Sequence, residues 1–244
     1  MDAYERGRPG YPLDAALWLT PEASGLVVEV GAGTGKLTRA LAGAGRHVLA
    51  VEPDERMRAV LDALSLPGVE SVSGSAESVP LEDQAACAVV SGSSFHWFDL
   101  DAALCEAARL LVPGGTLAFA WNRPDHSVAW VRRMSEAMRR GQPWRGNRPW
   151  AELVAATGLF EPLEQAGFPH VLALSVNAIG DYVRSYSRVG MLPEPEREAA
   201  IAQVRSSLRA EPGLEAAEVL EMPFVVTAYR TRLASTSPGS RGSV

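Results

Sequence analysis

A short apolar run followed by three alternating glycines constrains the fold of this chain more than any other feature. The run Leu26–Val30 is rich in valine, which is typical of a strand buried on both faces. Gly31, Gly33 and Gly35 follow it, and glycine lets the backbone turn sharply and lets a ligand approach the main chain. A helix that starts near Lys36 would point its free N–H groups at that ligand. The pattern predicts a nucleotide-type binding loop, with an ordinary tight turn as the alternative.

The spacing of the glycines decides between the known types of loop. A dinucleotide fingerprint and a P-loop would both need a glycine at position 36, where Lys36 stands. The sequence instead reads E-x-G-x-G-x-G from Glu29 to Gly35. This form resembles motif I of the class I S-adenosylmethionine-dependent methyltransferases, in particular the type 11-like branch that acts on small molecules. The resemblance implies that S-adenosylmethionine is the cofactor and that its binding residues include Glu29, Gly31, Ala32, Gly33, Thr34 and Gly35.

Composition sets the outer bounds. The chain has 244 residues, 47% hydrophobic and 21% charged, which suits one large α/β domain with a packed core. The net charge of −6 argues against general nucleic-acid binding. We expect no membrane span, because no run of roughly 18 apolar residues exists, and a cytoplasmic location, because the N-terminus lacks the pattern of a signal peptide. Cys87 and Cys105 are expected to be buried thiols, with no disulfide and no metal site.

Hydrophobic periodicity predicts alternating strands and helices. The expected strands cover residues 26–30, 46–51, 69–73, 85–90, 116–121, 171–175 and 224–229. The expected helices cover residues 13–19, 36–44, 54–64, 99–111, 127–140, 179–192 and 196–208. This order predicts an α/β fold with a doubly wound, mostly parallel seven-stranded sheet, the Rossmann-like methyltransferase fold, and a helical insertion near the C-terminus. We expect one domain over residues 1–233, with an N-terminal lid at 1–20, a helical cap at 177–212 and a disordered tail at 234–244.

An acidic residue stands at the tip of the second expected strand. The carboxylate of Glu52 could accept two hydrogen bonds from a ribose diol. The alternative is a charge at a helix N-terminus, which Asp54 and Glu55 fit better. We therefore assign Glu52, with its neighbour Pro53, to the cofactor site.

Two further segments resemble elements of the same family. The G-x-A-E-x-x-P segment at 74–80 implies that Ala76 and Glu77 lie beside the adenine, although it also reads as a plain helix cap. The R-x-L-x-P-G-G segment that begins at Arg109 is a helix stop followed by a turn, so its role is structural.

The end of the fourth expected strand should face the transferable methyl group, because ligands of open α/β sheets bind beyond the carboxyl ends of the strands. Ser91 is assigned there to the cofactor, and Phe95 and Trp97 to the substrate. His96 is the candidate catalytic base, since a neutral imidazole can take a proton from an attacking hydroxyl or amine. The alternative is that His96 simply packs the floor of the pocket.

Other aromatic and basic residues complete the predicted site. The opening Tyr4-Glu5-Arg6-Gly7-Arg8-Pro9-Gly10-Tyr11-Pro12 resembles that of a branch of small-molecule methyltransferases, which implies a lid. Arg6 and Tyr11 are assigned to the cofactor, and Tyr4 to the substrate, with a plain surface strap as the alternative. Substrate contacts are also expected from Trp121, at a strand end, and from Tyr186, in the cap, although a tyrosine in an amphipathic helix is more often core.

The function implied is methyl transfer from S-adenosylmethionine to a small molecule, such as a secondary metabolite. One alternative is a methyltransferase-like protein that binds the cofactor but catalyses another reaction, such as a cyclisation. Another is a binding module that uses the arginines and tryptophans of residues 124–150, which include Arg132, Arg133, Arg139, Arg140, Arg145, Arg148, Trp130, Trp144 and Trp150. A helix with a solvated arginine face explains that region as well. No metal, nucleic acid or membrane partner is expected, and the oligomeric state and the acceptor atom stay open.

Overall fold

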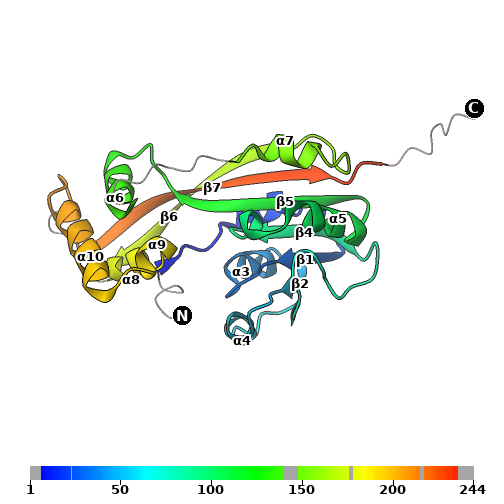
Figure 1. The fold of residues 1–244 in the computed structure, drawn as a ribbon, viewed down its shortest axis with the longest axis horizontal. Coiled ribbons are helices and arrows are strands. Elements are labelled where there is room, and N and C mark those ends of the chain that lie inside the picture. The colour runs from blue at the N-terminus through cyan, green and yellow to red at the C-terminus, as the bar shows by residue number, and fades with distance from the viewer. Residues whose placement is uncertain (1–6, 23, 140–147, 176–177, 215–216, 236–244) are drawn as a thin grey trace, which may run out of the picture. The chain divides into compact units, whose positions relative to one another are not determined.

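The structure is a computed structural model that describes residues 7–22, 24–139, 148–175, 178–214 and 217–235. The protein forms one seven-stranded sheet with the order β3-β2-β1-β4-β5-β7-β6 (Figure 1). The strands are β1 (Leu26–Val30), β2 (His47–Val51), β3 (Val69–Val72), β4 (Ala86–Gly92), β5 (Leu111–Pro124), β6 (Glu164–Ser175) and β7 (Val219–Arg232). The predicted α/β fold with a mostly parallel seven-stranded sheet is confirmed.

The helices alternate with the strands over the first half of the sequence, except that no helix separates β3 from β4. They are α2 (Leu13–Leu19), α3 (Lys36–Gly43), α4 (Glu55–Asp62), the 3₁₀ helix η1 (Phe95–Trp97), α5 (Leu100–Leu110), α6 (Ala129–Arg139), α7 (Trp150–Ala155), α8 (Ile179–Arg184), α9 (Ser187–Gly190) and α10 (Glu194–Arg209). None of the helices among the described residues is long and apolar enough to cross a membrane.

The strand order reverses between β1 and β4, and this reversal determines where a ligand can bind. Strand β1 pairs in parallel with β2 on one side and with β4 on the other. The polypeptide thus winds outward from β1 to β3 and then returns to β4 on the opposite side. The region beyond the carboxyl ends of β1 and β4 is the topological switch point, where ligands of open α/β sheets bind.

The core of the sheet follows from the valine-rich pattern. Val27, Val28 and Val30 of β1 are at most 4% exposed, as expected for a strand covered on both faces. Helix α3 buries Leu37 and Leu41 at helical spacing. The rigid frame that carries the glycine loop is therefore built from apolar residues whose periods are visible in the sequence.

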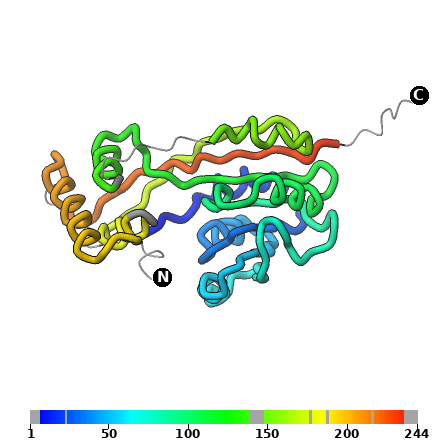
Figure 2. The backbone as a smooth tube through the Cα atoms, in the orientation of Figure 1, coloured from blue at the N-terminus to red at the C-terminus, as the bar shows by residue number. Residues whose placement is uncertain are grey.

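The protein divides into two compact units. The larger unit comprises residues Leu13–Ala120, Arg148–Ala166 and Ala228–Val244, and the smaller comprises Met1–Pro12, Trp121–Asn147 and Gly167–Thr227. The smaller unit has its own hydrophobic core, drawn from α6, α8, α10 and the ends of β6 and β7. Figure 2 shows the path of the backbone from β6 (yellow) through α10 (orange) to β7 (red).

Several local predictions differ from the structure. Strand β5 begins at Leu111 rather than at 116, and helix α7 was not predicted. The expected helix over 179–192 is two short helices, α8 and α9. Cys105 is exposed and Cys87 is only partly buried, so the expectation of two buried thiols was wrong. Most of the predicted tail, residues 236–244, lies outside the described residues.

Candidate functional site

The glycine loop joins β1 to α3 through three left-handed residues. The φ angles of Gly31, Gly33 and Gly35 are 68°, 58° and 86°, a region that costs other residues about 1–2 kcal/mol. The amide N–H groups of Gly31 and Ala32 both donate to the carbonyl oxygen of Val51, over 2.9 and 3.1 Å. The loop is thus fixed to the end of β2, and its glycines are required by backbone geometry.

One side of the loop is closed and the other is open. A Cβ atom built on Gly35, the N-cap residue of α3, would lie 2.5 Å from Leu61 Cδ1, so a side chain there would force Leu61 to shift. A Cβ atom on Gly33 would meet only Met57 Sδ, at 4.0 Å. The backbone at Gly33 therefore has room for a ligand, close to the positive end of the α3 dipole.

Glu52 stands at the carboxyl end of β2, where the sequence places it. Its side chain is 6% exposed. Oε2 accepts the N–H of Gly33 over 2.8 Å, and Oε1 accepts the N–H of Asp54 over 2.9 Å. Each carboxylate oxygen has more than one acceptor site, so Glu52 can brace the loop and still accept two hydroxyl groups. The N-cap of α4 is Asp54, which accepts from Arg56 and Met57.

Glu29 lies behind the loop and is almost fully buried, at 1% exposed. Thr38 Oγ1 donates to Glu29 Oε2 over 2.6 Å, which links the end of β1 to α3. Burial raises the pKa of the Glu29 carboxyl to about 8, although the bond from Thr38 lowers it and the nearby Glu52 carboxylate raises it further. At neutral pH Glu29 is therefore mostly protonated, and it stabilises the loop from behind.

Two buried hydroxyl groups near the loop have no hydrogen-bond partner among the described residues. They are Thr34 Oγ1, within the loop, and Ser91 Oγ, near the end of β4. The two residues are 2% and 1% exposed. A buried hydroxyl left unpaired costs about 1–3 kcal/mol, so this part of the protein has hydrogen-bonding capacity that a polar ligand could use.

A tight turn after β3 carries the two residues that the sequence assigns to the adenine. Ser75 and Ser78 exchange backbone hydrogen bonds of 3.2 Å. Between them, Ala76 is 5% exposed. Glu77 Oε1 accepts the N–H of Asp99 over 3.0 Å, so the carboxylate is bound to the start of α5. The sequence pattern indicated Ala76 and Glu77 but gave no sign of this long-range bond.

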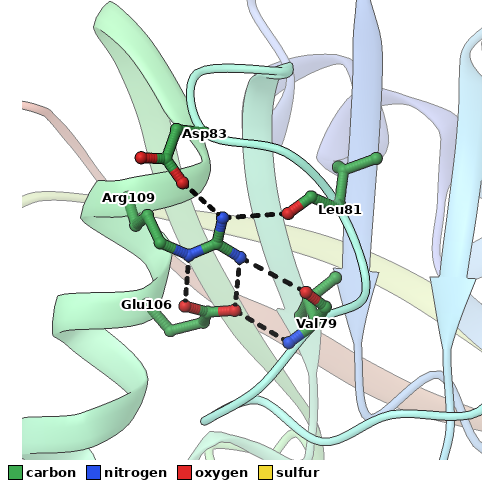
Figure 3. Close-up of polar contacts among 5 residues, drawn as sticks. All are labelled: Val79, Leu81, Asp83, Glu106 and Arg109. Atoms are coloured by element: carbon green, nitrogen blue, oxygen red, sulfur yellow. Dashed lines mark hydrogen bonds and ion pairs between the residues drawn. The ribbon is translucent and has the colours of Figure 1, made fainter.

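A cluster of polar contacts around Arg109 holds the segment that follows this turn (Figure 3). Arg109, near the end of α5, donates from Nε and Nη2 to both oxygens of Glu106, each over 2.7 Å. Its Nη1 donates to Asp83 Oδ1 and to the carbonyl oxygen of Leu81, and its Nη2 to that of Val79. The N–H of Val79 in turn donates to Glu106 over 2.8 Å. The Arg109 guanidinium lowers the pKa of Glu106, and the cluster fixes the residues that follow the turn on α5.

The residues after β4 form what we call the acceptor segment, residues 94–99. Phe95 is 3% exposed and stacks on Phe119 at a centroid distance of 4.1 Å, with the edge of Trp150 nearby. His96 is exposed, and Trp97 is 76% exposed, with its ring 4.9 Å from that of His96. Phe95 thus packs in the core, whereas His96 and Trp97 are accessible.

The comparisons with known proteins agree with this geometry. A family model described as a methyltransferase domain matches residues 28–119, which contain the glycine loop, Glu52, the turn and the acceptor segment. The uncharacterized methyltransferase Rv3342 of Mycobacterium tuberculosis is 37% identical over 235 residues, which cover 96% of this chain and 94% of that one. The chain belongs to the class I S-adenosylmethionine-dependent methyltransferases.

The methyltransferase has further relatives over its whole length. The uncharacterized methyltransferase C25B8.09 of Schizosaccharomyces pombe is 34% identical, over 93% of this chain and 92% of that one. A solved structure from Anaeromyxobacter dehalogenans, described as a type II methyltransferase, aligns with a TM-score of 0.66 over 92% of this chain and 96% of that one. The sequence identity to that structure is 23%, so this likeness shows the fold alone.

Other predicted site residues of the methyltransferase belong to the smaller unit. Trp121 is 7% exposed, with the guanidinium of Arg123 at 5.7 Å from its ring. The hydroxyl of Tyr186 is 2.8 Å from that of the fully buried Tyr182, and the guanidinium of Arg8 lies 4.3 Å from the Tyr186 ring. Tyr186 therefore contacts two residues of its own unit, Tyr182 and Arg8.

Of the predicted lid, residues 1–20, the structure describes residues 7–20; residues 7–12 belong to the smaller unit and residues 13–20 to the larger one. Arg8 donates to the carbonyl oxygen of Ser185 over 3.0 Å, and Asn122 Nδ2 donates to that of Gly10 over 2.6 Å. Tyr11 is partly buried. The sequence pattern gave no sign of the bond from Arg8, because its partner is 177 residues away. Several residues named from the sequence lie outside the described residues: Tyr4, Arg6, Arg140, Trp144 and Arg145.

No group of three or more His, Cys, Asp or Glu side chains that could hold a metal ion occurs among the residues that the structure describes.

Proposed function

We propose that this methyltransferase binds S-adenosylmethionine at the glycine loop and transfers the methyl group to a small molecule. The observation that carries the proposal is the placement of Glu52. Its buried carboxylate is held beside Gly33 by two backbone N–H groups and has acceptor capacity left for the two hydroxyls of a ribose. An ordinary tight turn would not need a buried carboxylate at that point.

The remaining cofactor contacts are proposed from their positions around the switch point. Residues 31–35 would border the amino-acid tail, Pro53 would lie beside the ribose, and Ala76 would lie beside the adenine. The orphaned hydroxyls of Thr34 and Ser91 fit a polar tail, because a ligand that pairs them removes the cost of their burial. Glu77 is proposed at the adenine too, with one oxygen already bound to Asp99.

The remaining proposed contacts come from the N-terminal segment and from two aromatic residues of the smaller unit. Arg6 and Tyr11 are proposed to bind the cofactor, and Tyr4, Trp121 and Tyr186 to contact the acceptor. Trp121 and Tyr186 are largely occupied by partners within their own unit. Trp97, by contrast, is 76% exposed.

The chemistry asks little of the protein beyond alignment. Bound S-adenosylmethionine would supply a methyl group on a sulfonium that is already activated for in-line displacement. The protein would contribute proximity and orientation, which together can lower the activation barrier by several kcal/mol. His96 would accept the proton that an acceptor hydroxyl or amine loses. The exposed ring of Trp97 beside it offers an apolar wall, which suits a small organic acceptor.

A small-molecule acceptor is favoured over nucleic acid by the net charge of −6. A secondary metabolite as acceptor stays a prediction from the resemblance. Product analysis tests the proposal: the enzyme is incubated with S-adenosylmethionine and a panel of phenols, amines and carbon acids. Formation of S-adenosylhomocysteine in a 1:1 ratio with a methylated product supports methyl transfer. Conversion of an acceptor without consumption of the cofactor would favour the cyclase-like alternative.

A further inference from the structure

The acceptor segment is held at both ends by hydrogen bonds to the two parts of the proposed cofactor site. At one end, Ser94 Oγ donates to the carbonyl oxygen of Gly31, in the glycine loop, over 2.8 Å. At the other end, the N–H of Asp99 donates to Glu77, in the turn after β3, over 3.0 Å. His96 and Trp97 lie between these two connections. The segment that carries the candidate base therefore depends on the same backbone that would surround the cofactor.

Packing reinforces the connection at Gly31. A Cβ atom built on Gly31 would lie 2.8 Å from Ser94 Cβ and 3.2 Å from Phe98 Cζ. The glycine loop and the acceptor segment are thus in direct contact, with no free space between them at that point. Phe95, stacked on Phe119, anchors the middle of the segment in the core. A small displacement of the Gly31 peptide must therefore move Ser94 or Phe98 as well.

We propose that Ser94 and Glu77 are positioning residues that couple occupation of the cofactor site to the placement of His96 and Trp97. The inference rests on the proposed function, since it takes the glycine loop and the turn as parts of one cofactor site. Its physical basis is a pair of hydrogen bonds and a packed contact, rather than mere proximity. Where an occupied cofactor site places His96 and Trp97 for the acceptor, the acceptor should bind more tightly to the loaded enzyme, and by reciprocity it should tighten cofactor binding by the same factor.

Fluorine NMR on the full-length protein can test this coupling without knowledge of the acceptor. The protein is labelled with 5-fluorotryptophan, and the resonance of Trp97 among the six tryptophans is assigned with Trp97→Phe. Titration with S-adenosylhomocysteine is expected to shift the Trp97 resonance of the wild type. In Ser94→Ala the shift at saturation should fall by more than half. The dissociation constant should change less than about fivefold, the scale of one neutral hydrogen bond.

A second pair of variants separates positioning from general damage. Glu77→Ala removes the acceptor for the Asp99 N–H and should also reduce the saturated shift. Glu77→Gln keeps an oxygen that can accept this bond, and should therefore retain the shift. Ser73→Ala, at an exposed serine just before the turn, is the matched control and should behave as wild type. If Ser94→Ala does not fold, the comparison of Glu77→Ala with Glu77→Gln decides.

The outcomes distinguish this inference from the proposed function. Binding of S-adenosylhomocysteine with no shift of Trp97 in the wild type would overturn the coupling and leave the cofactor site intact. An equal shift in wild type, Ser94→Ala and Glu77→Ala would overturn the roles of these two residues. No binding of S-adenosylhomocysteine at all would overturn the proposed function itself.

Discussion

Replacement of Glu52 by glutamine probes whether its carboxylate braces the glycine loop. In the wild type the two carboxylate oxygens accept the N–H groups of Gly33 and Asp54 over 2.8 and 2.9 Å. Glutamine keeps one acceptor oxygen and replaces the other with an NH₂ group, which is only a donor. One of the two backbone N–H groups then faces another donor, in a site where the wild-type side chain is 6% exposed.

The expected cost can be worked out from these contacts. One hydrogen bond to a charged group is lost and the other becomes a bond to a neutral group, which together amount to about 2–4 kcal/mol of unfolding free energy. The assay is guanidinium-induced unfolding of the wild type, Glu52→Gln and Glu55→Gln. The control Glu55 is an exposed glutamate in the first turn of α4, and its variant should unfold with the wild type. Coincident unfolding of Glu52→Gln and Glu55→Gln would refute the bracing role.

Burial raises the pKa of Glu29 from 4.5 to about 8. The unfolding free energy of the wild type should therefore fall as the pH rises across that interval, because the unfolded state releases the proton first. Urea unfolding of Glu29→Gln should depend less on pH, and a pH dependence equal to that of the wild type would contradict the burial argument. Arg109→Met leaves Glu106 without its cation and should lower the unfolding free energy by about 1–3 kcal/mol, a modest range because the guanidinium is partly exposed. A melting temperature equal to that of the wild type would disprove this role. His96→Ala should lower the rate of methyl transfer by about a hundredfold or more, with S-adenosylhomocysteine affinity near wild type, and full activity would exclude His96 as the base.

The sequence predicted the elements whose signals are local. The valine run of β1 and the glycines of its loop are contiguous in the sequence. The acidic residue Glu52 directly follows the next predicted strand, β2. Helical periods located α3 and α5 within one or two residues at each end. These signals depend on backbone geometry and burial, which are determined over a few neighbouring residues.

The long-range partners could not be predicted in the same way. The bond from Ser94 to Gly31 spans 63 residues, and the bond from Asp99 to Glu77 spans 22. The pattern of an aromatic run does not show which ring is buried, and the ring of Phe95, which the sequence assigned to the substrate, packs against Phe119 in the core. Cys105 was expected to be buried because it lies in an amphipathic helix, but it lies on the exposed side of α5. The start of strand β5 was predicted too late, because Pro113 and the glycines after it indicate a turn. The structure includes these residues in the strand.

Titration calorimetry with S-adenosylhomocysteine tests the central claim, that the cofactor binds at the glycine loop with Glu52 as the ribose ligand. The wild type should bind with a dissociation constant in the micromolar range. Glu52→Ala should bind more weakly by about 1.5–3 kcal/mol, the scale of hydrogen bonds to a charged group, while Glu55→Gln should bind as the wild type does. Equal affinity of wild type and Glu52→Ala would remove Glu52 from the site, and absence of binding to the wild type would contradict the proposed cofactor site as a whole.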